Sequence, residues 1–399
     1  MPQLSFDDQE ALIARCIDGD IDLAVELRQC GLTYDALRYR SNKPTTTAPK
    51  SVGIDDLRKN PSGVPTVSVF SGCGGLDLGL EAAGFEHVAL VDCDALFCDT
   101  LRKNRPAWRV LGPPACPGDV SDVDGVAATL EAAGIAAPFD GLFCGGPPCQ
   151  PFSIAANQRF AKAGPDFKRI GYAHETRGNL LLHYLDLVLR FRPRVFLVEN
   201  VVGLQTIDGG AQLQDACDLM SRAGYAIHGP QKVEASDYGV PQRRERLLIV
   251  GTRGGENFLF PQPSGERVPC SVPLCRPMNG AANHITREHG AGSVARYMNL
   301  GYRERDHLGR VDRLDPDLPS KTVIAGGTKG GGRSHLHPSI PRTLSVRECA
   351  RLQTFPESFI FTGPVARQFT QVGNAVPPKL AFYVGDAIMR DCFRHDRPR

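Results

Sequence analysis

The sequence predicts an α/β protein in which a doubly wound sheet carries a smaller, irregular second domain. Apolar runs at 66–70, 88–92 and 195–201 have the length and the β-branched content of buried strands. The first run leads through a glycine-rich turn into a helix, which is how a nucleotide-type α/β unit opens. From Gly254 to about Arg342 the composition shifts to Gly, Pro, His and Arg with little periodicity. That segment predicts the second domain.

The composition excludes several classes of protein. The chain has 399 residues, enough for two or more domains, and 42% apolar residues suit a globular core. No apolar run approaches the length of a membrane helix, and the N-terminus lacks the pattern of a secretion signal. The thirteen cysteines include no Cys-x-x-Cys pair, which argues for a reducing cytoplasm and against a disulfide framework or a structural metal site. We therefore expect a cytoplasmic protein without a metal and without a membrane partner.

Residues 1–62 are expected to form a helical extension and a linker. Helices are predicted at 7–16, 21–30 and 33–40, and their rhythm is that of a helix-turn-helix, with Gly31 in the turn. The alternative is an ordinary helical hairpin packed on the main domain.

The most distinctive stretch follows a short apolar run that ends at Phe143. Two glycines and two prolines form a stiff turn and hold Cys149 beyond the end of the predicted strand. In an open parallel sheet, ligands bind at the carboxyl ends of the strands. A lone cysteine is most often an inert core residue. A core cysteine, however, has no use for four neighbours that restrict the backbone, so Cys149 is a candidate nucleophile.

Three residues at successive strand ends indicate a nucleotide-like cofactor. Phe70 opens the glycine turn, and Asp92 lies 20 positions after Gly72, where a carboxylate can accept both hydroxyls of a ribose. Asp119 follows a third unit and could accept from an adenine amino group. The glycine spacing differs from the dinucleotide fingerprint, so NAD is a poor fit.

Two further stretches indicate catalysis. The run 195–201 is almost unbroken apolar sequence, as expected for a strand covered on both faces, and Glu199 stands near its carboxyl end. Partial desolvation there favours a proton-donating role. Gln242 to Arg246 is a charged run before another strand at 247–251.

Taken together, these stretches resemble the DNA (cytosine-5) methyltransferases. The resemblance covers roughly residues 64–391 and rests on four motifs in the family's order. They are Gly146-Pro147-Pro148-Cys149-Gln150-Pro151-Phe152-Ser153, Glu199-Asn200-Val201, Gln242-Arg243-Arg244-Glu245-Arg246 and Gly373-Asn374-Ala375-Val376-Pro377. The resemblance implies a Rossmann-like methyltransferase fold, S-adenosylmethionine as cofactor and double-stranded DNA as substrate. It further implies a catalytic domain at 63–253, a target-recognition domain at 254–342 and a return to the catalytic domain at 343–399.

The resemblance also implies the roles of individual residues. Cys149 would add to carbon 6 of a flipped-out cytosine, Glu199 would act on ring nitrogen 3, and Arg246 would hold the carbonyl oxygen. The implied catalytic residues are Cys149, Glu199, Arg246, Pro148, Asn200 and Arg244. The implied cofactor residues are Phe70, Ser71, Gly72, Gly74, Gly75, Leu76, Asp92, Cys93, Asp119, Val120, Pro147, Asn179, Leu180, Asn374 and Ala375. The family usually has Glu at the position of Asp92.

DNA contacts are expected in the irregular segment. Residues 254–342 contain twelve Lys and Arg against eight Asp and Glu, whereas the whole chain carries a net charge of only +2. The candidate contacts are Arg303, Arg305, Arg310, Lys329 and Arg333.

Three alternatives to a DNA methyltransferase remain open from the sequence alone. One is a tRNA cytosine methyltransferase of the same family, and another is a non-catalytic DNA-binding regulator on the same fold. The third is a dual role, in which residues 1–41 bind an operator while the rest methylates. The implied setting is a restriction-modification system with a separately encoded restriction endonuclease and a monomeric methyltransferase.

Overall fold

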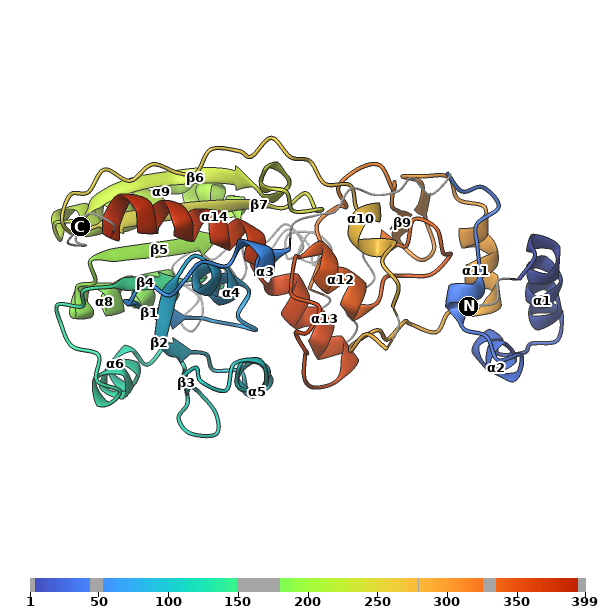
Figure 1. Ribbon diagram of the computed structural model, residues 1–399, viewed down its shortest axis with the longest axis horizontal. Coiled ribbons are helices and arrows are strands. Elements are labelled where there is room, and N and C mark those ends of the chain that lie inside the picture. Colours follow the sequence, from blue (N-terminus) through green and yellow to red (C-terminus); the bar gives the residue numbers. More distant parts are fainter. Residues whose placement is uncertain (1–3, 44–52, 149–179, 279, 326–334, 394–399) are drawn as a thin grey trace. The chain divides into compact units, whose positions relative to one another are not determined.

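The computed structural model describes residues 4–43, 53–148, 180–278, 280–325 and 335–393. The chain divides into two compact units (Figure 1). The sheet unit comprises Ile54–Ala235, Glu245–Pro263 and Val376–Arg399. The second unit comprises Met1–Gly53, Ser236–Arg244 and Ser264–Ala375. These units differ from the predicted domains toward both ends of the chain. The N-terminal extension and residues 343–375 belong to the same unit as the irregular segment that was predicted as a separate domain at 254–342.

The sheet unit contains a seven-stranded sheet in the order β3-β2-β1-β4-β5-β7-β6. The strands are β1 (Val64–Val69), β2 (Phe85–Val91), β3 (Val110–Leu111), β4 (Leu142–Gly145), β5 (Val195–Asn200), β6 (Ala226–Glu234) and β7 (Glu245–Thr252). The first five pair in parallel, whereas β7 runs antiparallel to both β5 and β6. The predicted doubly wound α/β class is confirmed.

Helices cover this sheet. They are α3 (Ile54–Leu57), α4 (Gly75–Ala82), α5 (Ala95–Asn104), α6 (Val123–Ala132), α8 (Leu180–Phe191), α9 (Ala211–Arg222) and α14 (Pro378–Ile388). Apolar side chains of α6, α8 and α9 share one buried core with the strands. Every residue of β4 and β5 is buried, which explains why β4 is apolar throughout and β5 is apolar up to Glu199. Figure 1 shows α14 in front of the strands.

Helices α4 and α14 pack so closely that the contact requires glycine. A Cβ atom at Gly79 would overlap the Cβ of Ala381 and the carbonyl of Pro378, and it would lie 2.6 Å from the backbone nitrogen of Phe382. Since a helix backbone cannot yield as a flexible side chain can, the two helices would have to move apart.

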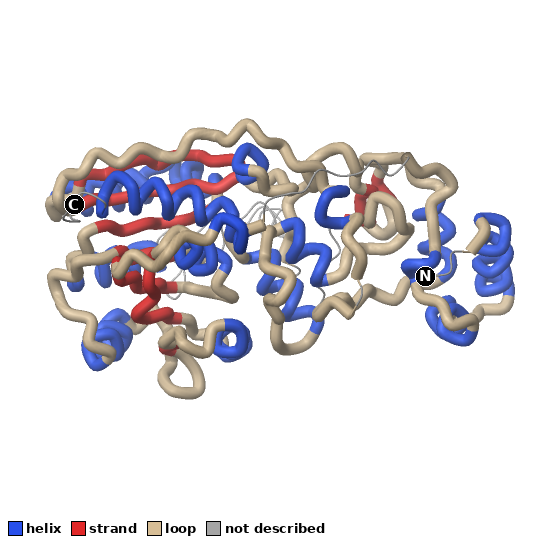
Figure 2. The backbone as a smooth tube through the Cα atoms, in the orientation of Figure 1, coloured by secondary structure: helices blue, strands red, loops and turns tan. Residues whose placement is uncertain are grey.

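The second unit is built mainly from loops between short elements (Figure 2). Its helices are α1 (Phe6–Asp18), α2 (Leu23–Gln29), α10 (Ser271–Leu274), α11 (Ala291–Met298), α12 (Val346–Leu352) and α13 (Val365–Asn374). A small sheet has the order β10-β9-β8, from β8 (Arg305–Asp306), β9 (Val311–Arg313) and β10 (His335–Leu336). Leucines of α1 and α2 share an apolar core with α11.

The N-terminal extension forms two of the three expected helices. The helices expected at 7–16 and 21–30 are present as α1 and α2. The prediction of a helix at 33–40 is wrong, because only a single 3-10 turn forms there, at Tyr34–Ala36. Leu37 and Tyr39 are only 2% exposed, so this stretch faces the interior. A helix-turn-helix with an exposed reading helix is therefore not formed here.

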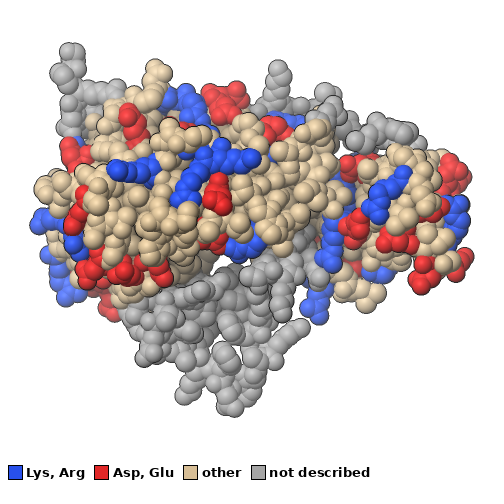
Figure 3. All heavy atoms as spheres, turned by 90° about the horizontal axis from the view of Figure 1, so that it is seen from below, with Lys and Arg blue, Asp and Glu red and all other residues tan. Residues whose placement is uncertain are grey.

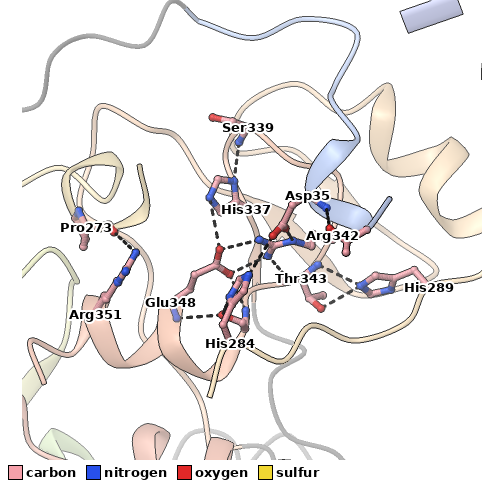
Figure 4. Close-up of polar contacts among 12 residues, drawn as sticks. Asp35, Pro273, His284, His289, His337, Ser339, Arg342, Thr343, Glu348 and Arg351 are labelled. Atoms are coloured by element: carbon pink, nitrogen blue, oxygen red, sulfur yellow. Dashed lines mark hydrogen bonds and ion pairs between the residues drawn. The ribbon is translucent and has the colours of Figure 1, made fainter. Parts of the chain in front are cut away.

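Two buried histidines of the second unit are held in the neutral form. The Nδ1 atom of His337 accepts the backbone N–H of Ser339 at 3.1 Å, and the Nε2 atom of His289 accepts the backbone N–H of Thr343 at 3.2 Å (Figure 4). A nitrogen that accepts a hydrogen bond carries no proton. Burial lowers the pKa of each ring to about 4, although Glu348 near His337 opposes this shift.

We predict that Gly79→Ala destabilises the sheet unit by about 1–3 kcal/mol, because the added methyl group overpacks the α4–α14 contact. Urea unfolding measures the loss. The matched control is Gly292→Ala in α11, where a Cβ meets nothing within 4 Å. That variant should be neutral or more stable by up to about 1 kcal/mol, as helix propensity requires. Equal effects of the two substitutions would contradict the close contact.

We also predict that acid destabilises the second unit through His289 and His337. Their folded pKa of about 4 lies below the ordinary value of 6.5, so the unfolded chain binds protons first. Their contribution to stability is complete above pH 6.5 and is lost as the pH falls toward about 4. NMR titration of the histidine ring signals tests this directly. Rings of these two residues that titrate near 6.5 in the folded protein would contradict the prediction.

Candidate active site

A left-handed turn follows β1 at the carboxyl edge of the parallel strands. Phe70, Gly72 and Gly74 have φ angles of 59°, 56° and 86°. A side chain at φ > 0 is strained, which accounts for the two glycines. Gly74 is the N-cap of α4, so the turn leads directly into a helix N-terminus. Such a turn exposes backbone N–H groups to a ligand.

Asp92 stands at the end of β2 and holds this turn. One carboxylate oxygen accepts the N–H of Gly72 at 2.7 Å, and the other accepts the N–H of Asp94 at 2.8 Å. Burial raises the pKa of Asp92 to about 6, against the opposing effect of these two backbone donors. Each carboxylate oxygen keeps a further lone pair for a ligand. Cys93, the next residue, is exposed.

The segment around Asp119 lies against the end of β2. A Cβ atom at Gly118 would collide with the carbonyl oxygen of Asp92, so only glycine allows this approach. Val120 is buried, and Asp119 borders a cavity of about 60 Å³ that Val91 and Leu111 also line. The structure thus gathers the predicted Asp92 and Asp119 segments. A glycine turn, a ribose-type acceptor and a small adjoining cavity fit a nucleoside cofactor.

The other predicted cofactor residues are distributed over both units. Ser71 is buried, and its hydroxyl donates to Ser68 Oγ at 3.0 Å. Gly75, Leu76, Pro147 and Leu180 belong to the sheet unit, whereas Asn374 and Ala375 stand at the end of α13 in the second unit. Asn179 lies outside the described residues.

Glu199 and Arg246 form an ion pair on adjacent strands. Glu199 of β5 is opposite Leu248 of β7, and Arg246 lies two residues away on the same face of the strand. The guanidinium Nε donates to a carboxylate oxygen of Glu199 at 2.6 Å. The two side chains are 10% and 11% exposed, so this pair is largely withdrawn from water. The antiparallel β7 strand therefore delivers the arginine to the glutamate.

The start of the cysteine loop lies beside this pair. A Cβ atom at Gly146 would stand 3.0 Å from a carboxylate oxygen of Glu199, so the backbone passes close to the carboxylate. The side-chain amide of Asn200 donates to the carbonyl of Pro147 at 3.2 Å. Asn200 thus joins the end of β5 to the loop. Pro148 is exposed, and Cys149 lies outside the described residues.

Arg244, one of the residues expected to be catalytic, is buried against backbone carbonyls of the second unit. It is 2% exposed, and its guanidinium donates to the carbonyls of Val323 at 3.2 Å and Gly373 at 2.8 Å. Beside it, Gln242 accepts the N–H of Val323 at 2.8 Å and donates to Gln353 at 2.9 Å. The sequence indicates Gln242 only as a member of the Gln-Arg-Arg-Glu-Arg motif, and no motif or periodicity in it indicates that Gln353 is its partner.

Of the expected DNA contacts that the structure describes, Arg303 and Arg310 lie in turns, and Arg305 starts the short strand β8. Arg303 and Arg310 have φ angles of 67° and 54°. Arg305 lies 3.8 Å from Asp312. Lys329 and Arg333 lie outside the described residues. On the face seen in Figure 3, acidic and basic side chains are interspersed over the described surface. On the described surface of that face, neither basic nor acidic side chains predominate.

Within the described part of the chain, no three His, Cys, Asp or Glu side chains converge in the manner of a metal site. No helix there is long and apolar enough to cross a membrane.

Comparison with known proteins places the chain among methyltransferases. The family model for C-5 cytosine-specific DNA methylases matches residues 64–271 and 275–390. The Type II methyltransferase M.Eco47II of Escherichia coli is 31% identical over 373 residues, covering 85% of this chain and 82% of the relative. The Type II methyltransferase M.PspPI of Psychrobacter sp. strain TA137 is 33% identical over 359 residues, covering 81% and 78%.

Solved structures show the same fold. A proposed DNA modification methyltransferase encoded within a prophage of E. coli superposes with a TM-score of 0.66 at 25% identity, over 82% of this chain and 99% of that one. The S. pombe Dnmt2 methyltransferase superposes with a TM-score of 0.56 at 17% identity, which shows the fold alone. Enzymes of the matched family use S-adenosylmethionine as methyl donor. With its glycine turn, its Glu199–Arg246 pair and a family match over most of its length, this chain belongs to the C-5 cytosine-specific DNA methylases.

Proposed function

We propose that the chain methylates carbon 5 of a cytosine within a specific duplex DNA sequence, as the modification enzyme of a Type II restriction-modification system. The relatives named as Type II methyltransferases support the biological setting. The observation that carries the chemistry is the ion pair of Glu199 and Arg246 beside the loop that leads into Cys149. A separately encoded restriction endonuclease is the partner that this setting implies.

The residues around Asp92 fit the cofactor. The turn from Phe70 to Gly74 would face it with backbone N–H groups, and Asp92 would accept from ribose hydroxyls. The cavity beside Asp119 would take part of the nucleoside. When bound, S-adenosylmethionine supplies an electrophilic methyl group.

The protein must make carbon 5 of cytosine nucleophilic. In the proposed step the Cys149 thiolate forms a bond to carbon 6. The electron pair of the 5,6 double bond then forms a 4,5 double bond, and the pair of the 3,4 double bond moves to ring nitrogen 3, which takes up a proton, so that carbon 5 becomes the nucleophilic end of an enamine. Glu199 donates a hydrogen bond or proton to ring nitrogen 3, and Arg246 donates to the carbonyl oxygen. Carbon 5 takes the methyl group as the methyl–sulfur bond of the donor breaks, and the donor's sulfur is left as a neutral thioether. A base then removes the carbon-5 proton, the 5,6 double bond re-forms and the thiolate leaves carbon 6.

This chemistry requires the base outside the helix. Carbon 6 and ring nitrogen 3 of a stacked, paired cytosine cannot be reached together by a thiolate and a carboxyl group, so the target must be flipped out. The 2.6 Å bond from Arg246 fixes the carboxyl group before the base arrives, which reduces the reorganisation needed in the reaction.

We predict that Glu199→Gln lowers kcat for methyl transfer by about 100-fold or more, because an amide cannot donate a carboxyl proton. Binding of DNA and of S-adenosylmethionine should be retained, since the side chain keeps its shape. Glu245→Gln is the matched control. Glu245 starts the same strand as Arg246 and forms an exposed ion pair with Lys232, so its loss should change kcat little. Equal kcat values for wild type and Glu199→Gln would refute the role of the carboxyl group.

The proposed function is tested by transfer of labelled methyl from S-adenosylmethionine to duplex DNA, with tRNA and the Cys149→Ser protein run in parallel. We expect label at carbon 5 of cytosine in DNA and none with the variant. Sequencing of the methylated DNA then gives the recognised site. Label in tRNA alone would replace the proposal with the tRNA enzyme. A folded, cofactor-binding protein that labels neither nucleic acid would indicate a non-catalytic regulator.

A further inference from the structure

The N-terminal segment Ser5–Lys43 lies outside the family match, which begins at residue 64, yet it forms part of the interior of the second unit. The apolar faces of α1 and α2 share a core with α11. The hydroxyl of Tyr34 donates to the carbonyl of His289 at 2.7 Å and accepts its N–H at 2.9 Å. The segment is thus an integral part of the unit.

Asp35 links this segment to two distant charged or titratable side chains of the unit. Its two carboxylate oxygens accept from Arg342 Nε at 2.6 Å and from His284 Nε2 at 3.1 Å (Figure 4). Burial by itself raises the pKa of Asp35. The hydrogen bond from His284 and the charge of Arg342 outweigh burial and hold the pKa well below its ordinary range. Asp35 is therefore an anion wherever the unit is folded near neutral pH.

Both partners of Asp35 lead to the same point, the N-terminus of α12. Arg342 donates two parallel bonds of 2.8 Å to Glu348, whose carboxylate also accepts the N–H of Ser345 at 2.7 Å. Ser345 is the N-cap of α12, and Glu348 completes its capping box. The other ring nitrogen of His284 lies 3.0 Å from the hydroxyl of Ser345. The carboxylate of Asp35 is thus connected to the N-cap of α12 by two routes, one through Arg342 and Glu348 and the other through His284.

Helix α12 in turn holds the irregular chain around it. Arg351 donates to the carbonyls of Pro273 at 3.3 Å, Arg276 at 2.8 Å and Pro277 at 3.1 Å. Arg347, fully buried, donates to the carbonyl of Ala282 at 2.8 Å. Among the described residues of 273–282, regular structure is limited to the end of the short helix α10, so these bonds determine much of the course of the chain there.

A second anchor of the segment leads to the predicted DNA-contact loop. The guanidinium of Arg313 lies between the rings of Tyr39 and Tyr302, 3.6 Å and 3.9 Å from their centroids. It also donates to the carbonyl of Ser41 at 2.9 Å. The backbone of Arg313 exchanges hydrogen bonds with the loop at Arg303, one of the expected DNA contacts. The N-terminal segment therefore contacts both irregular stretches of the unit.

We propose that Asp35 is a positioning residue for DNA recognition, and that the segment Ser5–Lys43 shapes the DNA-reading surface from within instead of binding DNA as a separate module. Asp35 acts through Arg342, His284 and the cap of α12. The proposal rests on the proposed function, in which the second unit reads DNA. It concerns affinity for DNA and choice of site, and it leaves the methyl-transfer step to the sheet unit.

The test compares steady-state methylation by full-length wild type, Asp35→Asn, Asp35→Glu and Asp18→Asn. Asp18 is an exposed carboxylate on α1 in the same segment and serves as the matched control. For Asp35→Asn we expect KM for cognate DNA to rise about tenfold, with kcat and KM for S-adenosylmethionine within about twofold of wild type. Methylation of near-cognate sites should rise relative to the cognate site. Asp35→Glu should recover most of the affinity for DNA, and Asp18→Asn should match wild type.

A purely structural role gives a different pattern. A lower kcat with unchanged KM for DNA, as for a smaller active fraction, would overturn the proposal, as would equal loss for Asp35→Asn and Asp18→Asn. If Asp35→Asn fails to fold, His284→Gln decides the question, because it removes the imidazole that contacts Asp35 and Ser345 and leaves the hydrogen bond between Asp35 and Arg342. The same selective rise in KM for DNA is expected, and no rise would refute the proposal. Wild-type protein without methyltransferase activity would instead refute the proposed function.

Discussion

Buried guanidinium groups hold the second unit together. Its chain has little regular structure, so many backbone carbonyls lack the partners that a helix or sheet would supply. A guanidinium offers five donors in a rigid fork and stays charged, so one side chain can satisfy carbonyls from several segments. Arg244, Arg313 and Arg347 each do this, and Arg342 joins two carboxylates across the unit. The course of the irregular segments in this unit depends on these interior bonds.

The sheet unit solves a different problem by regular means. Parallel strands bring successive loops to one edge, and glycines allow those loops to approach each other, as Gly118 does at Asp92. The antiparallel strand β7 adds a residue that a parallel strand could not have delivered from that point in the chain, since Arg246 enters beside Glu199 at the start of its strand. Regular strand pairing therefore places Glu199 and Arg246 side by side, whereas buried arginines hold the irregular segments of the second unit.

Much of the sheet unit could be predicted from the sequence, because buried parallel strands are apolar runs and tight turns need glycine. The strand that carries Glu199 was predicted for this reason, as was the strand at 247–251, although β7 begins two residues earlier and so includes Arg246. The edge strand β6 was not, since its residues are largely exposed and polar. The prediction of a third N-terminal helix was wrong because burial of Tyr34, Leu37 and Tyr39 outweighed the local propensity for helix. The role of Asp35 could not be predicted from the sequence, because its partners Arg342 and His284 lie far away in the sequence and long-range ion pairs leave no periodic pattern.

The interleaving of the two units also determines when each can form during synthesis. Asp35 is separated from Arg342 by 307 residues, and the sheet unit receives its last helix, α14, after that arginine. The first forty or so residues therefore leave the ribosome long before the chain that buries their apolar faces exists. Neither unit can be completed until nearly the whole polypeptide has been made, so a nascent chain exposes unpaired strands and apolar helices throughout elongation. For this architecture, late completion of both units follows from topology.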